Sequence, residues 1–271
     1  MFAKTVLDNG IRVVSYEMPE HRSVSLGIWV ENGSRHESAA QNGISHFIEH
    51  LLFKGTERRS AVQIAEEMDA VGGVLNAFTS KEQTCYYAKV LDENLPMAID
   101  LLTDIFLHSS FDAEEIERER SVILQEISQA EDTPDDYVHD LFSLDFFKNH
   151  PIGRPICGRE ETVTSFRRGD FLDFFKTRYR PRRVIVAAAG NFRHNALARE
   201  MGERLGAVSG LADGAMAPAL DGETAPEMAA ACFRTKKRWS RRTSAWVLPG
   251  FPRRTPSATS PTCSTHCLAA A

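Results

Sequence analysis

The sequence predicts an α+β fold in which helices pack against a mixed, largely antiparallel sheet. Strand patterns gather in the first 90 residues, most helical patterns follow one another after them, and one short apolar strand comes late, at residues 184–189. A doubly wound parallel sheet would instead alternate strand and helix along the whole chain. The 271 residues, 42% hydrophobic and 25% charged, suit one large globular domain or two modest ones.

The strands are predicted from apolar patterns that end at turn signals. Residues 4–16 form two short strands around Asp8-Asn9-Gly10, because Asn-Gly is typical of a tight hairpin turn. Residues 24–30 alternate apolar with small or polar side chains, as a half-buried strand does. Residues 74–79 and 84–90 form a second strand pair, joined by a short polar loop.

The helices are predicted from apolar periodicity and from capping signals. The helix at 44–53 ends at Lys54-Gly55, and the helix that begins at Ser60 ends at Gly72-Gly73. Asp112 is a typical N-cap, with acidic residues in the first turn after it. The remaining helices are expected at residues 93–108, 112–130, 135–147, 166–179 and 194–205.

Charge is divided unevenly along the chain, whose formal net charge is −5. Residues 232–271 contain eight Arg and Lys side chains and no Asp or Glu, so residues 1–231 hold all 37 acidic residues and 24 of the 32 basic ones. This acidic body argues against nucleic acid and anionic membranes as partners. No stretch approaches the roughly 20 apolar residues that a membrane-spanning helix needs.

The N-terminal residues and the cysteines both favour a cytoplasmic location. Residues 1–10 have neither a basic region followed by an apolar run nor the composition of a mitochondrial transit peptide. The five cysteines are odd in number and contain no Cys-x-x-Cys pair. We therefore expect reduced thiols rather than a disulfide framework.

The chain changes character after the last predicted helix. Residues 1–206 form the expected main domain, and residues 207–231, rich in Ala, Gly and Pro, are expected to form a linker. From residue 232 apolar periodicity disappears, so this segment cannot bury enough surface to offset its ordering entropy. It is either a disordered basic tail or the aberrant product of a frameshift. We favour the frameshift, because low-complexity tails seldom contain scattered Trp and Cys.

The strongest functional signal is His46-Phe47-Ile48-Glu49-His50, on the first predicted helix. Residues four positions apart lie about 40° from each other around a helix, so both imidazoles project from one face. Two nitrogens in that arrangement suit tetrahedral Zn²⁺, which also needs further protein ligands and an open position for water. Glu49 would then act as the base for zinc-bound water. The alternative for the motif alone is a solvated helix face.

A further metal ligand is expected from the acidic helix that begins after Asp112. Its candidates are Glu114, Glu115, Glu117, Glu119 and Glu126. Glu119 and Glu126 are seven residues apart and therefore share one face of the helix. The apolar residues expected to bury the same helix are Val122, Ile123 and Ile127. A glutamate beside them would point inward, whereas the alternative for Glu126 is a solvent-exposed carboxylate.

Together, these residues resemble the pitrilysin, insulin-degrading enzyme and mitochondrial processing peptidase family, whose His-x-x-Glu-His motif inverts the commoner His-Glu-x-x-His. The likeness spans roughly residues 2–205. It includes residues 43–56 (GISHFIEHLLFKGT), 75–84 (LNAFTSKEQT), 117–126 (ERERSVILQE) and 151–158 (PIGRPICG). The pattern looks most similar to the bacterial and mitochondrial processing-peptidase branch.

The resemblance implies a role for each residue of the metal site. His46, His50 and Glu126 would bind one Zn²⁺ per chain. Glu49 would be the general base, and Glu119 would be a second carboxylate that supports the site.

The resemblance also implies a substrate site on the strand at 74–79. Asn76 and Ala77 would lie on an edge strand beside the metal, where an extended peptide could pair through main-chain hydrogen bonds. Without the resemblance, Asn76 would be interpreted as a polar residue next to a turn.

The function that the resemblance implies is a zinc metalloendopeptidase that hydrolyses peptide bonds in extended peptides. Family members resemble two similar domains in tandem, so this chain is expected to be the N-terminal, catalytic half of a two-domain subunit. The alternative is a non-catalytic structural or partner subunit on the same fold, or an inactive remnant of it. A homodimer and pairing with a second family subunit both stay open.

Overall fold

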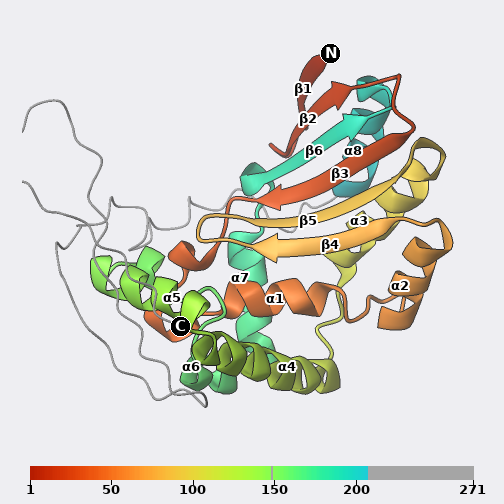
Figure 1. Cartoon of the computed structure of the whole chain (residues 1–271). Helices are drawn as coiled ribbons and strands as arrows, with labels where there is room; N and C mark the ends of the chain where they lie inside the picture. The colour runs from red at the N-terminus through yellow and green to blue at the C-terminus, as the bar shows by residue number, and fades with distance from the viewer. Residues whose placement is uncertain (148, 207–271) are drawn as a thin grey trace, which may run out of the picture.

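The computed structural model describes residues 1–147 and 149–206 (Figure 1). The linker expected at 207–231 and the tail expected at 232–271 lie outside these residues. The strands are β1 (Phe2–Val6), β2 (Arg12–Glu17), β3 (Ser23–Val30), β4 (Val74–Thr79), β5 (Thr84–Leu91) and β6 (Val184–Gly190). The helices are α1 (Ile44–Leu52), α2 (Ala61–Ala70), α3 (Leu95–His108), α4 (Ala113–Asp132), α5 (Pro134–Phe146), α6 (Glu160–Ser165), α7 (Arg168–Arg178) and α8 (His194–Leu205).

The strands form one open six-stranded sheet in the order β1-β2-β6-β3-β5-β4. β2 and β6 pair in parallel, and the other neighbours pair antiparallel. The late strand β6 therefore inserts between β2 and β3, and β4 is left at one edge (Figure 1). The predicted α+β fold with a mixed, largely antiparallel sheet is confirmed.

The core lies between the sheet and the helices that cover one of its faces (Figure 1). α3 packs on β3 and β5, α8 packs on β2, and both α1 and α2 contact β4. The largest fully buried side chains include the aromatic residues Tyr86, Tyr179, Phe47, Phe171 and Phe174. Because Phe47 belongs to α1, packing in this core fixes which face of α1 points away from it.

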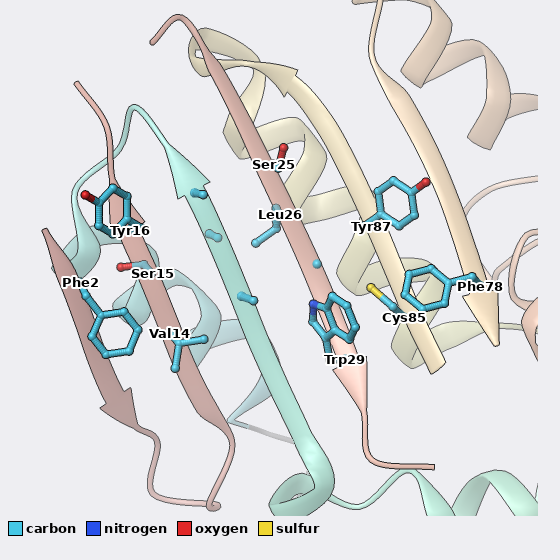
Figure 2. Close-up of a pocket in the computed structure, with 14 residues that line it drawn as sticks. Phe2, Val14, Ser15, Tyr16, Ser25, Leu26, Trp29, Phe78, Cys85 and Tyr87 are labelled. Carbon is cyan, nitrogen blue, oxygen red and sulfur yellow. The ribbon is translucent and has the colours of Figure 1, made fainter. Parts of the chain in front are cut away.

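The other face of the sheet carries no helix in the described part of the chain (Figure 1). Side chains from several strands line a shallow, mostly apolar hollow of about 460 Å³ there, as Figure 2 shows. Its aromatic members are Phe2, Tyr16, Trp29, Phe78 and Tyr87. No helix among residues 1–147 and 149–206 is both long and apolar enough to cross a membrane.

Two details of the predicted helices were wrong. One helix was expected at 166–179, but the chain forms α6 first and α7 only from Arg168, because Phe166 is extended between them. Val122 was expected to bury α4, yet it is 40% exposed. It lies about 100° around the helix from Ile123, which is fully buried, so it faces away from the core.

Candidate metal centre

α1 presents three polar side chains on the face that core packing leaves free. Its apolar residues Ile44, Phe47, Ile48, Leu51 and Leu52 are all buried. His46, Glu49 and His50 occupy the intervening positions and are only partly buried. The two imidazole rings lie edge to face, with centroids 4.7 Å apart. The helix period thus places both histidines together, as the sequence predicts.

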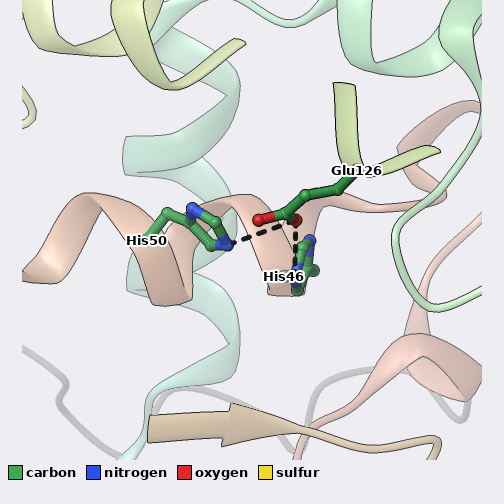
Figure 3. A group of neighbouring side chains, drawn as sticks. All are labelled: His46, His50 and Glu126. Atoms are coloured by element: carbon green, nitrogen blue, oxygen red, sulfur yellow. Dashed lines mark ion pairs between the residues drawn. The ribbon is translucent and has the colours of Figure 1, made fainter. Parts of the chain in front are cut away.

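α4 brings Glu126 to the two histidines. The helix begins at Asp112, whose side chain accepts hydrogen bonds from the N–H groups of Glu114 and Glu115, and it packs against α1. Oε2 of Glu126 lies 3.8 Å from Nε2 of His46 and 3.7 Å from Nε2 of His50. Figure 3 shows this carboxylate between the two rings.

The three side chains suit a tetrahedral metal such as zinc. One ligand atom from each of His46, His50 and Glu126 lies within 4.8 Å of the other two. Zn²⁺ with ligand bonds of about 2.0–2.1 Å holds ligand atoms about 3.3 Å apart, so each side chain needs to move by only a fraction of an ångström. Burial, followed by the charge of His50, lowers the pKa of His46 to about 4. His46 is therefore neutral at pH 7, the form that binds metal.

Glu119 contacts the ring nitrogen of His50 that does not face Glu126. Its carboxylate is buried, with the side chain 7% exposed, and its Oε2 lies 3.0 Å from Nδ1 of His50. When the Nδ1–H group donates this hydrogen bond to the carboxylate, Nε2 is the unprotonated nitrogen, and its lone pair faces Glu126. The ammonium group of Lys54, 2.7 Å from Oε1 of Glu119, balances the charge of the carboxylate.

Glu49 lies beside the three potential ligands and contacts β4. The hydroxyl of Thr79 donates a hydrogen bond of 2.5 Å to Oε2 of Glu49. Burial raises the pKa of Glu49, whereas the hydrogen bond from Thr79 and the charge of His50 oppose that rise. A carboxylate with a raised pKa is a better proton acceptor than an ordinary surface glutamate, which suits a general base.

Asn76 and Ala77 lie on β4, one of the two edge strands of the sheet. Asn76 pairs with Tyr87 and Ala77 with Tyr86 across the ladder to β5. The N–H of Ala77 donates a 2.8 Å hydrogen bond to Oδ1 of Asn76. Within the described residues, no further strand pairs with the outer edge of β4.

Two contributors to this site were not predicted from the sequence. Lys54 was interpreted only as a helix-ending basic residue, although its ammonium group neutralises Glu119. Thr79 lies within the segment 75–84 that carries the resemblance, yet nothing in its spacing shows that its hydroxyl reaches Glu49. Both contacts join residues of different elements, so only the folded chain reveals them.

The fold and the site define the class of protein, an α+β domain with the residue set of a metallopeptidase. The family description Insulinase (Peptidase family M16) matches residues 12–160. The chain belongs to this family.

Three comparisons place the chain among proteins of known sequence or structure. It is 50% identical over 191 residues to the uncharacterized zinc protease YmxG of Bacillus subtilis, a match that covers 70% of this chain and 47% of that protein. The fold is similar to that of a protease from Helicobacter pylori, with a TM-score of 0.77 at 24% identity over 81% of this chain and 54% of the other. It also resembles a peptidase M16 inactive domain from Pseudomonas fluorescens, with a TM-score of 0.74 at 15% identity over 84% and 54%. The chain spans about half of the length of the zinc proteases that it matches.

Proposed function

We propose that this chain is the catalytic half of a zinc-dependent metalloendopeptidase. The observation that carries the proposal is the cluster formed by His46, His50 and Glu126, whose ligand atoms lie within 4.8 Å of one another. Glu49 lies beside this cluster and accepts a hydrogen bond from Thr79. A catalytic zinc site needs three protein ligands, an open fourth position for water, and a carboxylate that acts as base without binding the metal. The relatives' name, zinc protease, agrees with this donor set.

The chain's own residues divide the work of peptide hydrolysis. Zinc, when bound, polarises the carbonyl of the peptide and makes water more acidic. Glu49 takes the proton from the attacking water and delivers it to the leaving amine. Thr79 keeps the Glu49 carboxylate turned towards the metal side of α1, because its hydroxyl is bonded to Oε2. Glu119 keeps Nε2 of His50 available for the metal.

The substrate is proposed to be an extended peptide bound along β4. An edge strand offers unpaired main-chain groups, and pairing through them tolerates many side-chain sequences. Asn76 and Ala77 lie on this strand, and Thr79 at its end contacts the proposed base. A strand-bound peptide would therefore lie next to Glu49.

The whole enzyme is proposed to contain a second half that encloses the substrate, since the chain spans about half of its relatives' length. We propose that it works in the cytoplasm, either as a homodimer or paired with a second family subunit. Comparison of the mass of the native assembly with that of the chain decides between a monomer and these pairings.

The decisive experiment replaces the base and retains the ligands. Glu49→Gln keeps the shape of the side chain and its contact with Thr79 but cannot accept a proton. We expect zinc content near one per chain, as in the wild type, and loss of cleavage of a quenched fluorescent peptide. Loss of zinc from Glu49→Gln would instead make Glu49 a ligand and contradict its proposed role.

The second candidate is a non-catalytic subunit or an inactive remnant on the same fold. It is favoured by the likeness to a domain described as inactive, which shows that this fold does not by itself require activity. The two candidates differ in turnover. Zinc bound at one per chain without any peptide cleavage by the wild type would support the non-catalytic alternative.

A further inference from the structure

A buried carboxylate that takes no part in the proposed chemistry lies at the start of the metal-binding helix. Glu37 is 2% exposed. Its Oε2 accepts hydrogen bonds from the N–H of Gly43, at 2.8 Å, and from Nδ2 of Asn42, at 3.2 Å. Its Oε1 accepts a hydrogen bond of 2.9 Å from the N–H of Ser45. Glu37 thus satisfies N–H groups that α1 itself leaves without partners.

Hydrogen-bond donors surround the buried Glu37 carboxylate. Asn42, Gly43 and Ser45 each donate a hydrogen bond to it, and the N-terminal end of α1 carries partial positive charge. Removal of a carboxylate from water is costly, and burial raises the pKa of Glu37 to about 7 against the opposing hydrogen bonds from Ser45 and Gly43. A polar group retained here at such a cost adds little net stability, so its value lies in the geometry that it fixes.

The loop at residues 154–158, part of the family-like segment 151–158, closes this site from the other side. Nη1 of Arg154 donates to the carbonyl of Glu37 at 2.9 Å, and Nδ2 of Asn42 donates to the carbonyl of Pro155 at 2.9 Å. A Cβ on Gly43, which has φ +97°, would lie 2.7 Å from the carbonyl oxygen of Cys157. The backbone of residues 42–43 is therefore held between the Glu37 carboxylate and this loop.

This arrangement acts directly on the metal ligands. Ser45, whose N–H binds Glu37, immediately precedes His46. α1 has only nine residues, so a rotation or shift at its first turn moves His46, Glu49 and His50 together. Misplacement of such groups by about 1 Å is enough to impair a site of this kind.

We propose that Glu37 is a positioning residue, which, together with the loop at 154–158, sets the rotation and depth at which α1 presents its histidines to Glu126. This inference rests on the proposed function insofar as the ligands bind zinc. Glu37 touches neither metal nor substrate and acts through Gly43 and Ser45.

The test compares zinc affinity at matched stability. Glu37→Gln keeps the size of the side chain but places an amide NH₂ opposite donors. We expect zinc to bind about 10- to 100-fold more weakly, the usual loss when a group that orients metal ligands is removed. The measurement is a competition titration against a chromophoric chelator at about pH 8, where Glu37 is ionised in the wild type. Circular dichroism verifies that the full-length variants are folded.

The matched control is Leu197→Ala in α8, which removes a buried side chain from the part of the core that packs on β2. It lowers stability without touching α1, so its zinc affinity should stay within about twofold of the wild type. Asn42→Ala, which loses the bonds to Glu37 and Pro155, is the milder variant if Glu37→Gln does not fold. Unchanged zinc affinity in folded Glu37→Gln, or in Asn42→Ala if that variant replaces it, would overturn the proposal. Equal weakening in Leu197→Ala would do the same.

Amide hydrogen exchange separates failure of this proposal from failure of the proposed function. If the wild type binds no zinc, the zinc-enzyme proposal fails, but exchange at residues 43–46 still reports on Glu37. Faster exchange there than in the remainder of Glu37→Gln supports the positioning role. Exchange that is unchanged at these residues, or uniformly faster along the chain, refutes it.

Discussion

Replacement of Glu119 by glutamine should weaken zinc binding without unfolding the chain. The Glu119 side chain is 7% exposed and accepts from Nδ1 of His50 at 3.0 Å. A hydrogen bond to a buried charged group contributes about 1.5–3 kcal/mol, which corresponds to a change of about 10- to 150-fold in affinity. Glutamine retains one acceptor oxygen, so Glu119→Gln should lie near tenfold. Glu119→Ala removes the acceptor and should approach the upper end.

The assay is a chelator competition titration on the folded variants, with Glu117→Gln as the matched control. Glu117 lies on the same helix two residues earlier, but its side chain is 68% exposed and it pairs with Arg120. Its replacement should leave the zinc dissociation constant within about twofold, because exposed pairs contribute little. Glu119→Gln with the affinity of the wild type would show that His50 needs no carboxylate behind it, and the reasoning would be wrong.

Three further predictions concern other residues around α1. Thr79→Val should lower peptide cleavage by about 10- to 100-fold with unchanged zinc content, because Glu49 loses its hydroxyl partner. Thr79→Ser retains the hydroxyl and should keep most of the wild-type activity. Equal activity of the wild type and both variants in a quenched-peptide assay would contradict this role of Thr79. Because the pKa of Glu37 is raised to about 7 in the folded chain, the stability that it contributes is fully present below about pH 4.5 and declines by about 3 kcal/mol as pH rises to 7. Urea denaturation of wild type and Glu37→Gln across this window should show that difference, and parallel curves would contradict it. Gly43→Ala should lower the free energy of unfolding by about 1–3 kcal/mol, because φ is +97° and the new Cβ would meet the carbonyl of Cys157; an unchanged urea midpoint would disprove the strain.

The fold was predictable from the sequence where local signals were strong. The turn at Asp8-Asn9-Gly10 and the cap at Asp112 gave the first hairpin and the start of α4. Strand order was not predictable, because insertion of β6 between β2 and β3 depends on contacts more than 150 residues apart in the chain. The wrong prediction that Val122 is buried has a similar origin, since an apolar side chain does not by itself indicate whether another element packs over it.

The site was predictable to the extent that helix geometry determines it. His46 and His50 share a helix face because they are four residues apart, whatever the tertiary structure. The choice of Glu126 over the other glutamates of α4 came from the resemblance, and the packing of α4 on α1 brings this residue to the histidines. The role of Glu37 was invisible, because a glutamate nine residues before a motif histidine has no pattern that marks it as buried.

The cost of this polar arrangement is itself an argument about function. Around α1 the chain buries Glu37 and Glu119, and Nδ1 of His46 is buried without a hydrogen-bond partner among the described residues. Each such group is less favourable in a protein interior than an apolar side chain of similar size. A fold kept only for its shape would gain stability by exchanging them for leucine or methionine, as stabilised proteins commonly do at sites without a role. His46 on α1 and Glu119 on α4 lie at the candidate metal centre, and Glu37 binds the first turn of α1. Their joint presence around α1 is therefore better explained by metal chemistry than by the stability of the scaffold.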